Sequence, residues 1–194
     1  VSSGHHLFWF IQLMKYGGAI AAVPIGAAVA LAIVEKWRPS PGFEVERNAL
    51  LFSMLLFGAG GIIGFMISGS TVTVPAHYHG SIVGITIAFM GISYHLLEQL
   101  GYSRVSGRMA RWQPGIYGGG QLMHIIGLAW SGGYNVARKS TSAERGIEQI
   151  AGMGLMGLGG LVSIIGGITF LLLVYRSLKA GRKTGKADQA TDSH

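Results

Sequence analysis

The chain has 194 residues, of which 49% are hydrophobic and 12% charged, and 32 are glycine. This balance is too apolar for an ordinary soluble domain and indicates a membrane protein. The sequence contains no cysteine, which excludes disulfides, cysteine-bound zinc and iron–sulfur clusters, so any metal must be held by nitrogen or oxygen ligands.

Five stretches are long enough to cross a hydrocarbon core, which needs about 20 apolar residues. In chain order they are 15–37, 48–68, 75–100, 114–133 and 148–175. Pro24 lies within the first, where neighbouring helices can satisfy the carbonyl that it frees. Pro114 opens the fourth, a position that suits proline. We therefore predict an all-α membrane protein.

The interior of the predicted spans is rich in glycine, as in GAGGIIG at 58–64 and GMGLMGLGG at 152–160. Such clusters are typical of helices that pack closely in a membrane. A phosphate-binding loop is a poorer interpretation, because no strand precedes the glycines and no P-loop lysine follows them. The sequence thus predicts one five-helix domain over 1–176, followed by a disordered basic tail over 177–194.

The basic residues fall unequally on the two sides of the predicted bundle. Eleven lysines and arginines flank the spans on the side of the tail: Lys36, Arg38, Arg47, Arg104, Arg108, Arg111, Arg176, Lys179, Arg182, Lys183 and Lys186. Four lie on the other side: Lys15, Arg138, Lys139 and Arg145. Because cytoplasmic loops carry the excess of basic residues, we expect the tail in the cytoplasm. The net charge of +7 is then mainly a topology signal, and no nucleic-acid binding is expected.

Four of the seven histidines share one level on the outer side of the predicted bundle: His5, His6, His77 and His79. Successive helical residues are rotated by about 100°, so His77 and His79 should point roughly 200° apart. Such a pair cannot bind one metal, but it can hold one metal centre on each side of a helix. His5 and His6, at a helix start, can instead converge on one ion of copper, iron or zinc.

The simpler interpretation of a histidine in a membrane helix is a hydrogen-bonded polar residue inside the bundle. We adopt it for the isolated His95 and His124. Four imidazoles at one depth, with no carboxylate near them, are energetically expensive in an apolar bundle and therefore suggest function.

Several motifs in order resemble a known family. They are GHHLFW, a following span with AVPIGAAV, then VPAHYHGSIVGITIAFMGISYHLLEQLGY, and GLAWSGGYNVARK. Together they resemble the second half of subunit I of the heme–copper oxidases, the superfamily of cytochrome c oxidase and nitric oxide reductase. The resemblance extends to about Arg176. It implies that the chain forms the last five helices of a bundle of about twelve.

The resemblance also implies roles for individual residues. His5 and His6 would ligate the active-site copper, and His77 would ligate the high-spin heme where oxygen is reduced, so these three form the expected catalytic set. His79 would ligate the low-spin heme that supplies electrons. Arg138 and Lys139 would bind heme propionates, with interfacial anchoring as their alternative role.

The chain departs from the family pattern in ways that limit what it can do alone. The second axial ligand of the low-spin heme and the third ligand of copper come from earlier helices, which are absent here. A partner polypeptide carrying the N-terminal half is therefore expected, and the chain is either a split subunit or a fragment. Ala28 stands where many oxidases carry a proton-uptake lysine, and the loop before VPAHYHG lacks the magnesium-binding His-Asp pair, so proton pumping is left open.

The expected function is part of the catalytic core of a terminal oxidase that reduces dioxygen to water, with two hemes and copper as cofactors. Nitric oxide reduction with non-heme iron is one alternative, a non-catalytic heme-binding electron-transfer subunit is another, and a transporter is the weakest. Expected partners are the other oxidase subunits, membrane lipid and an electron donor such as cytochrome c or quinol. The expected location is the inner membrane of a prokaryote.

Overall fold

The computed structural model describes residues 4–36, 40–67, 71–133 and 146–181. Throughout these ranges the regular elements are helices. The chain divides into two compact units, Val1–Pro39 and Ser40–His194, and each is described by itself.

The first unit is one long helix in three parts. The α-helix α1 (Gly4–Gln12) passes through a π-helical segment, η1 (Leu13–Gly17), into α2 (Gly18–Glu35), and Pro24 lies inside α2. No residue of these three elements is buried within the unit. The helix includes His5 and His6 in its first turn and so begins before the predicted span 15–37.

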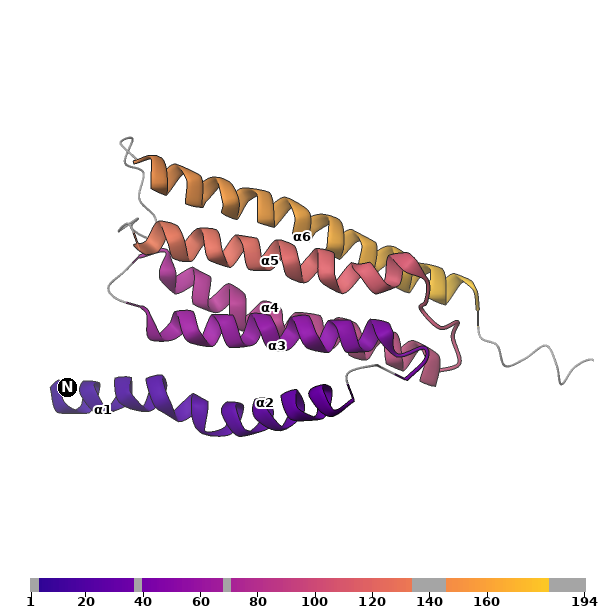
Figure 1. The fold of residues 1–194 in the computed structure, drawn as a ribbon, viewed down its shortest axis with the longest axis horizontal. Coiled ribbons are helices and arrows are strands. Elements are labelled where there is room, and N and C mark those ends of the chain that lie inside the picture. The colour runs from indigo at the N-terminus through magenta and orange to yellow at the C-terminus, as the bar shows by residue number, and fades with distance from the viewer. Residues whose placement is uncertain (1–3, 37–39, 68–70, 134–145, 182–194) are drawn as a thin grey trace, which may run out of the picture. The chain divides into compact units, whose positions relative to one another are not determined.

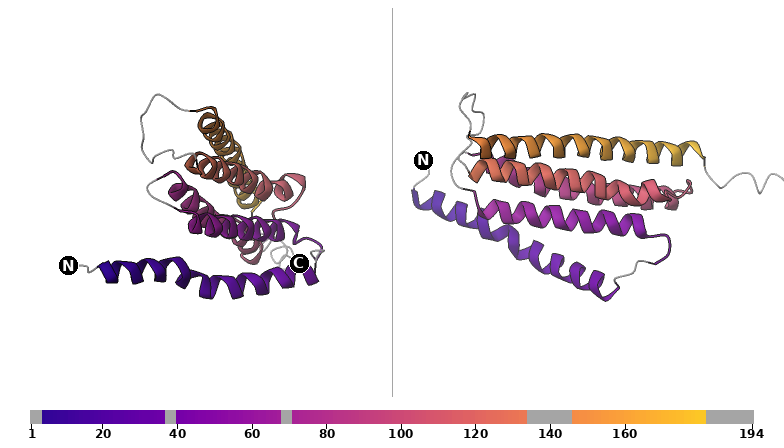
Figure 2. Two further views of the ribbon diagram at one scale, coloured as in Figure 1. Left: turned by 60° about the vertical axis from the view of Figure 1, so that its left-hand side comes forward. Right: turned by 45° about the horizontal axis from the view of Figure 1, so that its top comes forward.

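In the described residues of the second unit, four helices follow one another. They run alternately up and down, as Figure 1 and Figure 2 show. They are α3 (Glu44–Phe65), α4 (Thr73–Gln99), α5 (Arg108–Gly133) and α6 (Ile147–Lys179). Helix α3 packs on α4 and helix α5 on α6, while α5 also contacts α3 and α4. The unit thus has two ends: α3 and α5 begin at one and end at the other.

Four helical segments of the described chain are long and apolar enough to cross a membrane: Gly4–Glu35, Glu44–Phe65, Thr73–Gln99 and Ile147–Lys179. The fourth predicted span, 114–133, also forms a helix, but the composition of α5 is not apolar enough for it to count as a candidate membrane span. The reason is its position, since α5 contacts all three other helices of its unit and buries polar and small residues such as Gln113, Ser131 and Gly120.

The start of α5 differs from the prediction. The helix begins at Arg108, so Pro114 lies inside it rather than in its first turn. Proline removes one hydrogen bond from the helix ladder just before it. The side-chain amide of Asn48 in α3 donates a hydrogen bond of 3.1 Å to the carbonyl of Arg111, which helps to hold this turn.

The helix α6 extends beyond the predicted span 148–175, because Lys179 is still helical. Residues 182–194 of the predicted tail lie outside the described residues.

Glycines form the contact surfaces of both helix pairs, which confirms the packing interpretation. A Cβ atom added to Gly80 of α4 would stand 2.6 Å from Cα of Gly60 in α3. A Cβ atom added to Gly159 of α6 would stand 2.5 Å from the amide nitrogen of His124 in α5. Neither position has room for a side chain, so the paired backbones lie in direct contact.

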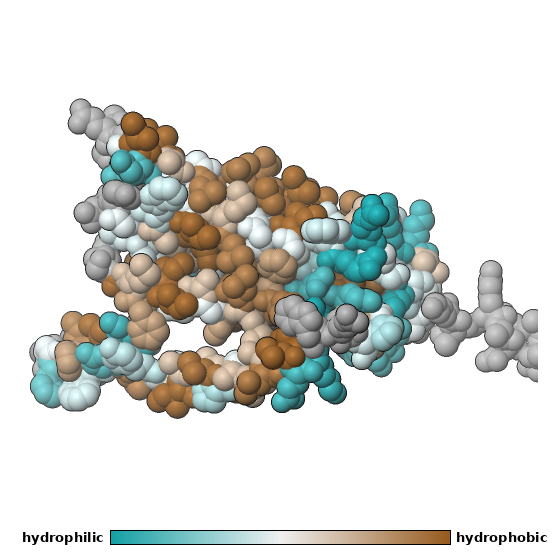
Figure 3. All heavy atoms as spheres, viewed as in Figure 1, coloured by the Kyte–Doolittle hydropathy of each residue, from teal (hydrophilic) through white to brown (hydrophobic). Residues whose placement is uncertain are grey.

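The two ends of the four-helix unit differ in chemistry. At the end where α4 and α6 finish, which we call the charged end, Arg104 pairs with Glu98 at 3.3 Å and approaches Glu46 at 4.0 Å. Figure 3 shows hydrophilic atoms gathered at this end and hydrophobic atoms over the middle of the helices. Next to it, buried Tyr94 donates a hydrogen bond of 2.9 Å to Oε1 of Gln113, and Nε2 of Gln113 donates one of 3.1 Å to the carbonyl of Gly166.

Candidate functional site

The opposite end carries three histidines, His77, His79 and His124, and we call it the histidine end. His77 and His79 lie in the first two turns of α4. The Nδ1 atom of His77 is 2.8 Å from the carbonyl oxygen of Gly60 in α3, whereas the ring of His79 lies 4.8 Å from the ring of His124 in α5. The two imidazoles therefore contact different neighbouring helices, whereas the predicted angle of roughly 200° between them and their roles stay predictions.

Hydrogen bonds fix the tautomer of all three rings. Nδ1 of His79 is 2.9 Å from the carbonyl oxygen of Pro75, and Nδ1 of His124 is 3.0 Å from that of Met156. A carbonyl oxygen only accepts, so Nδ1 must carry the hydrogen in each ring, as it must in His77. In the neutral imidazole, Nε2 then keeps its lone pair. This is the arrangement of a metal-ligating histidine, whose other nitrogen usually donates to a carbonyl or carboxylate.

Helix α3 forms a fitted seat for His77. Gly60 supplies the carbonyl that accepts the hydrogen bond, and Gly64 follows it one turn later. A Cβ atom added to Gly64 would stand 2.8 Å from Nδ1 of His77, so only glycine leaves room for the ring. The half-buried His77 is therefore held in one orientation by a neighbouring helix.

His124 is a site residue that sequence reasoning missed. The prediction of a hydrogen-bonded histidine is correct, but its contact with His79 was not foreseen. The one available signal was the position of each histidine along its helix. His79 lies six residues after the start of α4, and His124 lies nine residues before the end of α5. If the two helices are antiparallel neighbours, the two histidines therefore differ in level by less than one helical turn of about 5.4 Å.

The other predicted site residues are placed differently. His5 and His6 are exposed in α1, with their rings 6.1 Å from Trp9 and 6.2 Å from Phe10, and they belong to the first unit. Arg138 and Lys139 lie outside the described residues. In the part of the chain that the structure describes, no group of three or more histidine or acidic side chains could hold a metal ion.

His95 does not lie inside the bundle, so the prediction for this residue is wrong. Its side chain is exposed near the charged end, and its ring lies 6.4 Å from that of Phe43.

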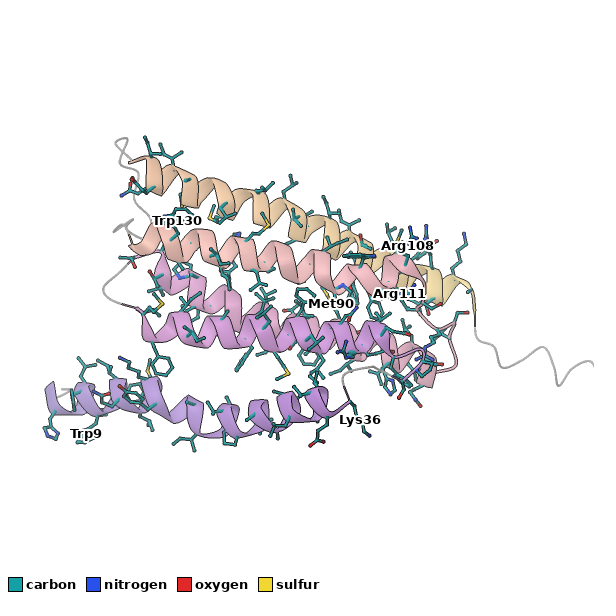
Figure 4. The ribbon with its side chains drawn as sticks, viewed as in Figure 1. Trp9, Lys36, Met90, Arg108, Arg111 and Trp130 are labelled. Carbon is teal, nitrogen blue, oxygen red and sulfur yellow. The ribbon has the colours of Figure 1, made fainter. Side chains whose placement is uncertain are left out.

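Figure 4 shows that α5 carries Arg108 and Arg111 towards the charged end and Trp130 towards the histidine end. Both kinds of side chain are typical of the ends of membrane helices.

Comparison with known proteins finds two relatives, each described as an uncharacterized protein. A protein of Rickettsia prowazekii is 36% identical over 146 residues, which cover 70% of this chain and 29% of that protein. A protein of Aquifex aeolicus is 29% identical over 86 residues, which cover 44% of this chain and 22% of that protein. The chain thus spans less than a third of the length of either relative. No family model matches it.

Proposed function

We propose that the chain forms part of the catalytic core of a respiratory terminal oxidase of the heme–copper type. The observation that carries this proposal is the pair His77 and His79, fixed on two sides of α4 with Nδ1 engaged and Nε2 bearing a lone pair. One rigid helix would then hold two separate centres at nearly the same depth. That is what electron transfer from a low-spin to a high-spin heme requires.

His77 would ligate the high-spin heme, and His79 the low-spin heme. The carbonyls of Gly60 and Pro75 keep the protons of these rings on Nδ1, so each Nε2 is presented in its neutral form. When bound, the hemes and a copper ion would supply the redox chemistry of dioxygen reduction. The contribution of this chain is to position the ligands and to surround them with apolar helices.

His5 and His6 would hold the copper ion, and a partner polypeptide would supply the remaining ligands. Two imidazoles suit copper. The length of both relatives also supports a larger assembly, because the matched regions make up 29% and 22% of them. Arg138 and Lys139 would bind the heme propionates.

Optical spectroscopy of the complex purified through a tag on this chain tests the proposal. We expect two heme species, of which one binds carbon monoxide, and one copper per complex by metal analysis. A complex without heme would refute the proposal. Non-heme iron in place of copper, with turnover of nitric oxide instead of dioxygen, would identify a nitric oxide reductase.

A non-catalytic heme subunit is the second candidate. It is favoured by His79, whose ring is held by its hydrogen bond to Pro75 and would still ligate a heme, although this candidate leaves His5 and His6 without a role. This candidate would be correct if the purified complex held heme but neither copper nor non-heme iron.

The proposed location is the inner membrane of a prokaryote, with the tail in the cytoplasm. Four apolar helical segments and the basic residues beside the charged end support it. In right-side-out vesicles, a protease should leave the tail intact. Cleavage of the tail in such vesicles would reverse the orientation.

A further inference from the structure

The contact between His79 and His124 extends the site beyond the two predicted heme ligands. The ring centroids are 4.8 Å apart and the ring planes are inclined by 36°. The two residues belong to different helices, α4 and α5, and α6 contributes the carbonyl of Met156 that anchors His124. Three helices therefore converge on this pair.

His79 and His77 differ in what holds them. His77 is half-buried and is anchored by α3, a neighbouring helix. His79 is exposed, and its hydrogen bond goes to Pro75 in its own helix. A bond to the same helix restrains the ring less than a bond to another element, because both partners move together. The ring of His124 is a tertiary contact of the His79 ring, and it comes from another helix.

His124 is anchored in the same way as His77. In both cases Nδ1 donates to a carbonyl of a neighbouring helix, from Gly60 for His77 and from Met156 for His124. In both cases a glycine follows that carbonyl by four residues, Gly64 in α3 and Gly160 in α6. A Cβ atom added to Gly160 would lie 3.5 Å from Nδ1 of His124, an ordinary contact, so this seat is slightly wider.

We propose that His124 is a positioning residue that sets the plane of the His79 imidazole in the low-spin heme. This inference rests on the proposed function, because it takes His79 to be an axial ligand. An axial imidazole binds iron along Nε2, and the orientation of its plane determines how its π orbitals overlap with the iron d orbitals. A residue that fixes this plane therefore affects the electronic structure of the heme without touching the iron.

The test uses electron paramagnetic resonance of the low-spin ferric heme in the purified complex. His124→Ala removes the ring, and His124→Phe keeps a ring but removes its anchor to Met156. We expect both to retain low-spin heme, with a shifted largest g-value for His124→Ala and a broadened signal for His124→Phe. Ile126→Ala changes an exposed side chain of the same helix and should leave the signal unchanged.

Several outcomes would overturn the inference. One is a His124→Ala signal superposable on that of the wild type at equal heme content. If His124→Ala does not accumulate, His124→Phe is compared with the wild type instead, and a superposable signal would again overturn the inference. If neither accumulates while Ile126→Ala does, His124 serves folding and the inference is wrong. A non-heme metal lost equally in His79→Ala and His124→Ala, with heme unchanged, would make the pair a metal site instead.

A further variant separates failure of this inference from failure of the proposed function. His79→Ala should abolish the low-spin signal. If the signal survives that change, His79 is not a heme ligand and the proposed function itself fails. If His79→Ala abolishes the signal while His124→Ala leaves it unchanged, only the positioning role is refuted.

Discussion

The two ends of the four-helix unit use polar side chains in opposite ways. Near the charged end, Tyr94 and Gln113 are buried and hydrogen-bonded to each other and to the backbone, so their polar atoms serve to join α4, α5 and α6. At the histidine end, His77, His79 and His124 each donate through Nδ1 and keep the lone pair of Nε2. Tyr94 and Gln113 are thus paired with each other and with the backbone, whereas each of the three imidazoles has a second nitrogen that could serve the proposed chemistry.

The largest effects should come from the two histidines of α4. We expect His77→Ala to remove carbon monoxide binding while low-spin heme remains, and His79→Ala to remove the low-spin signal while heme that binds carbon monoxide remains. Both variants can lose some assembly, because cofactor binding contributes to folding. The ratio of the two spectral species in the surviving complex is therefore the measurement.

His95→Ala provides the matched control, since His95 lies on the same helix but is exposed at the other end. It should leave the ratio unchanged. A change of the ratio in the same direction for His77→Ala and His79→Ala would show that the two residues do not serve separate centres.

Removal of the buried pair near the charged end should affect stability instead of spectra. In Tyr94→Phe, Oε1 of Gln113 loses its donor while still buried, which typically destabilises by about 1–3 kcal/mol. Thermal or denaturant unfolding of the purified complex measures the loss, and the heme ratio should stay constant. Tyr175→Phe, at an exposed tyrosine, is the control and should change neither property. A changed heme ratio in Tyr94→Phe would break the distinction between the two ends.

The glycine seats at the histidine end allow a finer test. Gly64→Ala places a methyl group 2.8 Å from Nδ1 of His77, so the ring must shift and its hydrogen bond to Gly60 should weaken. We expect a changed Soret band and altered affinity of the high-spin heme for carbon monoxide. Gly160→Ala, with 3.5 Å to His124, should have a smaller effect on the low-spin heme. Gly61→Ala meets nothing within 4 Å and controls for the added methyl group. Identical spectra for Gly64→Ala and Gly61→Ala would show that the seat does not orient His77.

The smallest expected effect concerns Arg138 and Lys139, the basic pair that the sequence predicts on the outer side of the bundle. A positive charge near a heme favours the electron-rich reduced state. Arg138→Gln should therefore lower the reduction potential of one heme while both hemes remain bound, as a redox titration would measure. An unchanged potential would indicate that Arg138 anchors the chain at the membrane interface.

Local periodicity predicted most of what is observed, and tertiary contacts account for the rest. The five helices follow from residue spacing along the chain. The contact of His77 and His79 with different helices follows from their spacing within one helix. Both kinds of spacing can be read from the sequence. The start of α5 at Arg108 was missed because Pro114 is a common first-turn residue, and only the structure shows Asn48 supporting the turn before it. The pairing of His124 with His79 depends on which helices are neighbours, and spacing within one helix carries no such information.

The limited hydropathy of α5 has a consequence for how the protein is made. A segment enters the bilayer from the insertion machinery according to its own hydrophobicity, and α5 is below the level of the four apolar segments. Helix α6 is synthesised next and is one of those segments. The contact surface of α5 with α6 includes Gly120 and Gly159, which bring the backbones together. In a bilayer, α5 would therefore be retained as half of a helical hairpin with α6, and loss of the glycine contact would act first on biosynthesis.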